Sequence, residues 1–166
     1  TRCALGPKRR RKAVVGAGAH NARFLFVYDT TTEIDEASSM PMVGSEGELF
    51  LDLMEQAGID LKESYCTPLV GCRPILLIPA TEEAEERIVD RAPSKEELAA
   101  CKPRVSSIIY ATDPDIVFAV GAEAWKARVK PKDRGLSGTH DKALGEIFLT
   151  RIPGKITGEL SYPVIP

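Results

Sequence analysis

The chain has 166 residues, of which 43% are hydrophobic and 28% charged, and its net charge at pH 7 is −2. These values are ordinary for one globular domain with a single core. No apolar run approaches the roughly 20 residues that a membrane-spanning helix needs, and no secretory signal is recognisable, so we expect neither a membrane nor a secreted protein. We therefore expect one domain over residues 1–166, located in the cytoplasm.

Charge is spread unevenly along the chain. Five consecutive cations lie near the N-terminus, namely Lys8, Arg9, Arg10, Arg11 and Lys12. A local basic patch can bind phosphates on a protein that is not basic overall, because counterion release depends on local contacts. The alternative is a solvated surface segment without a partner.

The first half of the chain predicts a strand, a helix and a second strand. Residues 24–28 are an apolar run with aromatic and β-branched side chains, which is typical of a buried strand. Residues 29–44 are polar and predict irregular structure, with the acidic residues 33–36 in a solvated loop; a hard-metal site is the alternative. Apolar residues at helical spacing predict a helix over 47–57, and residues 64–70 form the second strand.

A charged segment, residues 77–93, separates the two halves, and we expect it to be a surface insertion with room for a short helix. A capping box at Ser94–Glu97 then begins a helix that continues toward Ile108. Pro103 lies inside this helix, so we expect a kink or a break there.

The second half continues the alternation of strands and helices. A strand over 115–120 turns at Gly121 into a helix over 122–129, and strand candidates follow at 147–150 and 156–160. This alternation predicts an α/β fold, a three-layer α/β/α sandwich with a short, mainly parallel central sheet.

The four cysteines are Cys3, Cys66, Cys72 and Cys101. Disulfides are not expected in a chain without secretory features, and this favours the interpretation that the cysteines bind a metal ion or a cluster. Each cysteine could equally be a small buried hydrophobic residue.

Several segments in a fixed order resemble one family. Phe26-Val27-Tyr28-Asp29 stands where that family has a strand ending in Gly-Glu-Ala-Pro-Gly, and Met40-Pro41-Met42-Val43-Gly44 resembles its Gly-Arg-Pro-Phe-Val-Gly. Residues 65–74, ending in Cys72-Arg73-Pro74, are similar to Tyr-Ile-Thr-Asn-Val-Val-Lys-Cys-Arg-Pro. Residues 96–103 resemble the helix of that family that carries a cluster cysteine. Residues 114–124 resemble its strand that ends in a glycine turn. The chain thus resembles the uracil-DNA glycosylase superfamily, in particular its family 4 iron–sulfur type, and we expect it to be truncated at both ends.

The resemblance implies a [4Fe–4S] cluster held by four cysteines. Cys3, Cys72 and Cys101 align with three ligands, the fourth would precede Thr1, and Cys66 matches no cluster position. Thiolates suit iron–sulfur chemistry, and zinc is the alternative metal for the same ligands. Such a cluster would link the basic N-terminal segment, residues 1–22, to the rest of the domain.

The resemblance also implies a base pocket, from which this chain departs. Enzymes that act on a flipped base read its edge by hydrogen bonds and stacking. Asp29 keeps a carboxylate in the first motif, flanked by Tyr28 and Thr30, whereas Met42 replaces the stacking phenylalanine and Pro68 replaces the base-reading asparagine. The family's late His-Pro-Ser loop is not found. Asp29 is therefore either a catalytic group or a strand-end carboxylate that caps backbone amides.

The resemblance implies a DNA-binding iron–sulfur module, which we expect to be associated with the nucleoid. The departures from the family motifs predict that its uracil excision is lost or redirected. It would belong to a larger DNA replication or repair protein or assembly, without a membrane partner. DNA contacts are predicted for Lys8–Lys12, Arg73 and Arg134. One alternative is an active glycosylase that hydrolyses the N-glycosidic bond of a modified or damaged base, with Asp29 as its catalytic group. Another is a structural interaction domain without nucleic-acid contact.

Overall fold

The computed structural model describes Cys3, Leu5 and residues 13–81, 84–128, 148–151 and 161–165, the last two segments as backbone. In this part of the chain, one sheet has the strand order β1-β3-β2-β6-β8-β7. Its strands are β1 (Ala17–Gly18), β2 (Phe24–Thr30), β3 (Ser64–Val70), β6 (Ile116–Val120), β7 (Phe148–Arg151) and β8 (Ser161–Ile165). β3, β2, β6 and β8 run parallel, while β1 and β7 pair antiparallel at the two edges. The predicted, mainly parallel central sheet is confirmed.

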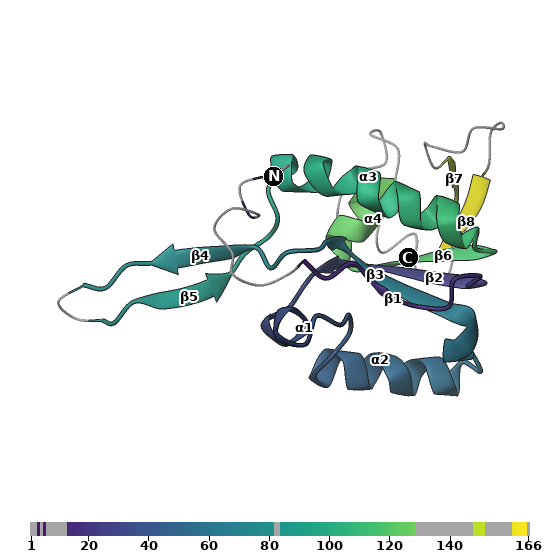
Figure 1. Ribbon diagram of the computed structural model, residues 1–166, viewed down its shortest axis with the longest axis horizontal. Helices are drawn as coiled ribbons and strands as arrows, with labels where there is room; N and C mark the ends of the chain where they lie inside the picture. Colours follow the sequence, from purple (N-terminus) through teal and green to yellow (C-terminus); the bar gives the residue numbers. More distant parts are fainter. Residues whose placement is uncertain are drawn as a thin grey trace.

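Helices cover both faces of this sheet (Figure 1). One face carries α3 (Lys95–Thr112) and α4 (Ala122–Arg128), and the other carries α1 (Glu33–Ser38) and α2 (Ser45–Gln56). A short 3-10 helix, η1 (Leu61–Glu63), leads into β3. The predicted three-layer α/β/α arrangement is therefore confirmed.

The first four residues of the central strand β2, Phe24–Val27, are apolar because both faces of the strand are covered. Successive side chains of a strand point to opposite faces. Leu25 and Val27 are fully buried in the core that the sheet shares with α3 and α4. On the opposite face, the ring of Phe26 stacks on Phe118 at 4.5 Å between centroids and meets Phe50 of α2 edge-on at 5.0 Å. A continuous apolar run is the expected pattern for such a strand.

α3 is continuous through Pro103, so the predicted break is wrong, while the alternative, a kink, stays a prediction. α3 begins with the predicted capping box, in which the Ser94 hydroxyl accepts a hydrogen bond from the Glu97 amide and the Glu97 carboxylate accepts one from the Ser94 amide. Beyond the proline, Val105 and Ile109 are buried against the sheet. Their packing outweighs the single helical hydrogen bond that a proline removes.

Residues 29–44 are more ordered than their polarity suggests. β2 extends to Thr30, and α1 follows with a capping box formed by Thr32 and Asp35. Asp35 and Glu36 are buried, with exposed fractions of 1% and 7%. The prediction of a solvated acidic loop is therefore wrong for these two residues, and the Thr32-x-x-Asp35 spacing was the available signal.

The charged segment before α3 forms a hairpin rather than a short helix. Strand β4 (Ile75–Ile78) pairs antiparallel with β5 (Arg87–Asp90), and the hairpin projects from the body of the molecule (Figure 1). Near the end of the chain, β7 occupies the first predicted tail strand, whereas residues 156–160 lie outside the described residues. Among the helices of the described segments, none has both the length and the apolar composition that crossing a membrane requires.

Candidate functional site

A pocket of about 220 Å³ lies at the carboxyl ends of β2 and β6. Ligands of parallel α/β sheets commonly bind at this edge. The lining residues are Tyr28, Asp29, Thr30, Thr32, Asp35, Met42, Val43, Glu46, Gly47 and Val120. The pocket therefore brings together four of the residues predicted from sequence, namely Tyr28, Asp29, Thr30 and Met42.

Asp29 joins this pocket to the start of α4. Its Oδ1 atom accepts a hydrogen bond of 2.7 Å from the backbone amide of Ala124. Burial raises the pKa of the Asp29 carboxyl, an effect opposed in part by hydrogen bonds from the backbone amides of Ala124 and Glu123. A Cβ atom at Gly121 would lie 2.5 Å from Asp29 Cγ, so the carboxylate packs directly against the glycine turn. Asp29 therefore caps the first turn of α4, and its catalytic role stays a prediction.

Tyr28 and Asp35 form a buried polar pair beside Asp29. The Tyr28 hydroxyl donates a hydrogen bond of 3.3 Å to Asp35 Oδ2. Asp35 also accepts hydrogen bonds from the backbone amides of Thr32, at 3.2 Å, and Val43, at 2.9 Å. Burial, followed by the nearby Asp35 charge, raises the pKa of the Tyr28 phenol, which therefore stays protonated. Asp35 thus ties β2, α1 and the loop before α2 to one another.

Met42 lines the pocket and has a backbone conformation that residues other than glycine rarely adopt. Its φ is +54°. Such strain is held in place by surrounding contacts and is common at functional sites. Gly47, in the first turn of α2, provides one of these contacts, because a Cβ atom there would lie 1.9 Å from the Met42 carbonyl oxygen. In residues 42–47, the backbone of Gly47 therefore lies directly against the backbone carbonyl of Met42.

Comparison with a family profile identifies the family to which this chain belongs. The sequence profile of the family described as the Uracil DNA glycosylase superfamily matches residues 15–161. The chain belongs to the uracil-DNA glycosylase superfamily.

Several curated proteins of this superfamily are similar to the chain. The type-4 uracil-DNA glycosylase of Thermotoga maritima is 32% identical over 69% of this chain and 53% of its own length. The type-4 enzyme of Pyrobaculum aerophilum is 26% identical over 91% of this chain and 68% of its own. That of Saccharolobus solfataricus is 29% identical over 69% of this chain and 47% of its own. The chain thus spans about half the length of the first and third relatives.

Pro68, where the resemblance expects the base-reading asparagine of the superfamily, does not line the pocket. Its side chain is fully buried within β3. Its backbone carbonyl accepts a hydrogen bond from Arg104 Nη2. The structure thus places Pro68 in the interior of β3, apart from this pocket, and its predicted base-pocket role stays a prediction.

Arg104, which sequence reasoning missed, is a partly buried cation of α3. Its guanidinium donates to the Val15 carbonyl at 2.7 Å and to the Thr67 hydroxyl at 2.8 Å, in addition to Pro68. Burial lowers the pKa of Arg104, and its Nε has no hydrogen-bond partner among the described residues. These hydrogen bonds connect α3 to the segment around Val15 and to β3. No sequence pattern marks it, since its partners are mostly backbone carbonyls distant in sequence.

Arg73, predicted to contact DNA, is held by two carboxylates of the same chain. Its guanidinium contacts Glu33 at 3.0 Å and Asp90 at 2.5 Å, and its side chain is 14% exposed. These ion pairs raise the pKa of Arg73 and join α1 to the base of the β4–β5 hairpin. A phosphate contact by Arg73 would have to compete with both carboxylates.

The cysteines do not by themselves complete a cluster site. The four thiols, all of which the structure describes, form no disulfide. Cys72 and Cys101 both lie within electrostatic range of Arg104, whereas burial raises the pKa of the Cys66 thiol to about 12. Among the described residues, no group of three or more cysteine, histidine or acidic side chains is placed to hold a metal ion. The [4Fe–4S] cluster with Cys3, Cys72 and Cys101 as ligands stays a prediction.

The remaining predicted DNA contacts cannot be located. Lys8, Arg9, Arg10, Arg11, Lys12 and Arg134 all lie outside the described residues. Their contact with DNA stays a prediction.

Proposed function

We propose that this chain is a DNA-binding member of the uracil-DNA glycosylase superfamily that does not excise uracil. One observation carries the proposal: the described pocket contains three carboxylates, Asp29, Asp35 and Glu46, and no side-chain amide. Membership of the superfamily supports the DNA substrate class, because the similar proteins are named uracil-DNA glycosylases.

The chemistry of uracil explains why this lining is unfavourable. The edge of uracil presents two carbonyl oxygens, which need hydrogen-bond donors, around one N–H group. A side-chain amide offers both a donor and an acceptor, whereas an ionised carboxylate is an acceptor only. Carboxylates placed against the carbonyl oxygens would repel them. In addition, the Tyr28 hydroxyl is already engaged by Asp35.

An excision assay tests the proposal. The protein would be incubated with a duplex that carries a single uracil, and abasic sites would be cleaved with alkali, with an active type-4 enzyme as the positive control for the substrate. We expect no strand breaks above the level of a protein-free sample. Breaks at uracil that disappear in Asp29→Ala would contradict the proposal.

DNA binding needs a separate measurement. We expect affinity for an unmodified duplex that weakens as salt increases, because phosphate contacts release counterions. Replacing Arg9, Arg10 and Arg11 by alanine should weaken binding and flatten its salt dependence, while Lys62→Ala, an exposed lysine on η1, is the matched control. A chain that binds no DNA at low salt would instead be a structural interaction domain.

The same pocket supports a second candidate function, the removal of a damaged base that carries a positive charge or exposed amino groups. Three carboxylates around one pocket favour hydrogen-bond donors and cations. Asp29, whose pKa is raised by burial, would be the group that positions water. Duplexes with single alkylated purines, assayed as above, test this candidate. Release of such a base by the native chain but not by Asp29→Asn, with Glu48→Gln on the outer surface of α2 as control, would establish it.

The iron–sulfur cluster remains a proposal that depends on Cys3, Cys72 and Cys101. Its support is the resemblance to the family 4 type together with the shared position of Cys72 and Cys101 near Arg104. Anaerobic purification followed by iron, sulfide and zinc analysis tests it. We expect bound iron that is lost in Cys72→Ser and Cys101→Ser and retained in Cys66→Ser. Protein without iron would reject the cluster, and zinc in its place would support the alternative metal.

A further inference from the structure

The β4–β5 hairpin exposes apolar side chains far from the core. It projects from the body of the molecule (Figure 1), and Leu76, Leu77 and Ile88 are 53%, 52% and 54% exposed. Leu77 lies directly opposite Ile88 in the ladder, so these two side chains share one face. An isolated two-stranded hairpin is only marginally stable in water. A surface that covers Leu77 and Ile88 would therefore stabilise the hairpin.

The outer end of this hairpin is acidic. Glu85 and Glu86 precede β5 and are exposed. The exposed Arg87 balances one of these charges. A surface that covers the hairpin should therefore be apolar at its centre and cationic at its rim.

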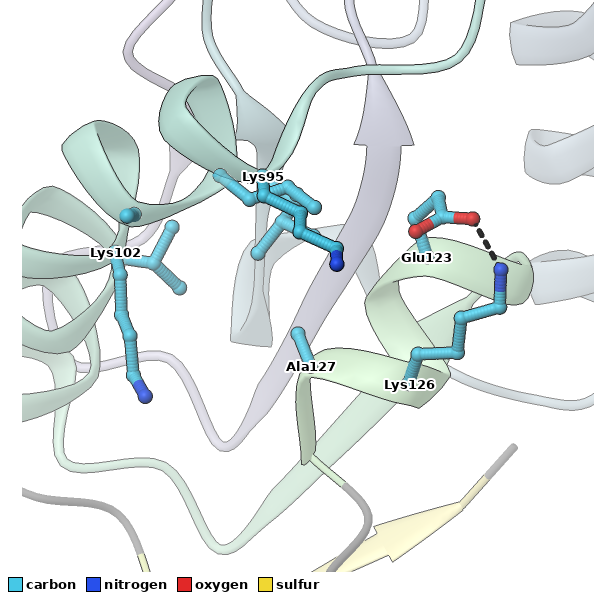
Figure 2. Close-up of a pocket in the computed structure, with 9 residues that line it drawn as sticks. Lys95, Lys102, Glu123, Lys126 and Ala127 are labelled. Carbon is cyan, nitrogen blue, oxygen red and sulfur yellow. Dashed lines mark hydrogen bonds and ion pairs between the residues drawn. The ribbon is translucent and has the colours of Figure 1, made fainter. Parts of the chain in front are cut away.

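A groove with this character lies between α3 and α4 of the same protein (Figure 2). Its volume is about 400 Å³. The floor is aliphatic, formed by Leu69, Leu98, Ala99, Val105 and Ala127. Lys95 and Lys102 of α3 and Lys126 of α4 stand around it, with Glu123 paired to Lys126.

The charges and shape of the groove favour a protein side chain over a nucleic-acid base. Lys95 and Lys102 are exposed, and neither has a salt-bridge partner among the described residues. None of the described lining residues is aromatic, whereas proteins that hold unpaired bases stack them on aromatic rings. Aliphatic side chains flanked by carboxylates suit the groove better.

We propose that the β4–β5 hairpin of one copy of this chain docks in the α3–α4 groove of a second copy. Leu77 and Ile88 would enter the aliphatic floor, and Glu85 and Glu86 would face Lys95 and Lys102. The contact is intermolecular because the hairpin points away from α3 and α4 of its own chain (Figure 1). A contact between two different patches propagates into rings or chains unless the geometry closes. This inference is independent of uracil excision and of DNA binding.

Sedimentation velocity of the full chain without DNA tests the contact over about a hundredfold range of concentration. We expect self-association that weakens at high salt, since the rim of the contact is charged. The double variants Lys95→Glu/Lys102→Glu and Glu85→Lys/Glu86→Lys should each weaken it by about tenfold or more. Lys62→Glu and Glu55→Lys reverse exposed charges on η1 and α2 and should leave it unchanged.

Mixing the two double variants provides the decisive measurement, because each then carries the partner charge that the other needs. We expect association of the mixture to recover to within about threefold of the native chain, while each variant alone stays monomeric. Circular dichroism of each variant establishes that it is folded. A native chain that is monomeric at every concentration, or self-association that persists in both folded double variants, would overturn the proposal.

Discussion

The Asp29 carboxylate and the Ala124 backbone amide are 2.7 Å apart, so the strand that leads to the pocket also holds the first turn of α4. A residue that belongs to a motif of a glycosylase superfamily therefore has a structural partner in this chain. The pocket and the helix cannot be altered independently, because the Asp29 side chain contributes to both.

This contact predicts how substitutions of Asp29 affect stability. Asp29→Ala removes the hydrogen-bond acceptor and should lower the free energy of unfolding by about 1 kcal/mol, the usual cost of losing a helix cap. Asp29→Asn keeps an acceptor and should lower it less. Urea unfolding followed by circular dichroism measures both. Equal losses in the two variants would contradict the capping role.

The raised pKa of Asp29 also predicts a pH dependence. The folded chain binds a proton at Asp29 more readily than the unfolded chain does, so its contribution to stability is complete below the ordinary pKa of 3.8 and decreases as pH rises through the folded value. The native chain should therefore lose stability relative to Asp29→Asn as pH rises from the acid range toward neutrality. Unfolding curves for both proteins at several pH values test this, and a difference that grows in the opposite direction would refute it.

The Tyr28–Asp35 pair predicts a cost for removing one hydroxyl. Tyr28→Phe leaves the buried Asp35 carboxylate with one donor fewer and should lower the free energy of unfolding by about 1–3 kcal/mol. Tyr110→Phe is the matched control, since Tyr110 is 51% exposed, and should change it by less than about 0.5 kcal/mol. Similar effects of the two substitutions would mean that the buried hydrogen bond contributes little.

The close contact between Gly47 and Met42 predicts a strong effect of one added methyl group. Gly47→Ala should lower the free energy of unfolding by about 1–3 kcal/mol and disturb the pocket loop, because the new Cβ collides with a backbone carbonyl. Gly58→Ala offers a comparison without a collision: nothing lies within 4 Å, and only its positive φ is unfavourable. It should cost about 1 kcal/mol. Thermal unfolding ranks the two variants, and a smaller loss at Gly47 would contradict the packing described.

Arg104 predicts that lysine cannot replace arginine in this part of α3. Its guanidinium bonds to Val15, Thr67 and Pro68 at once, a fork that a single ammonium group does not reproduce. Arg104→Lys should lower the free energy of unfolding by about 2–4 kcal/mol, against less than about 0.5 kcal/mol for the exposed Arg87→Lys. Chemical denaturation of both variants provides the comparison.

The sequence by itself determined the layers, the central strands and the family resemblance, because these depend on local periodicity and on motifs that keep their order along the chain. The apolar runs of β2 and β6 and the capping box of α3 could be recognised for this reason. The same motifs selected Tyr28, Asp29, Thr30 and Met42, which the fold then gathers into one pocket.

Only the tertiary structure decided what each polar side chain does. Asp29 caps α4, Asp35 is buried rather than solvated, Arg73 is bound by Glu33 and Asp90, and Arg104 donates hydrogen bonds to backbone carbonyls. Each of these roles depends on a partner far away in sequence or on burial by other elements, and local residue patterns do not encode either. The continuity of α3 through Pro103 has the same origin, since contacts with the sheet outweigh the local preference of the chain.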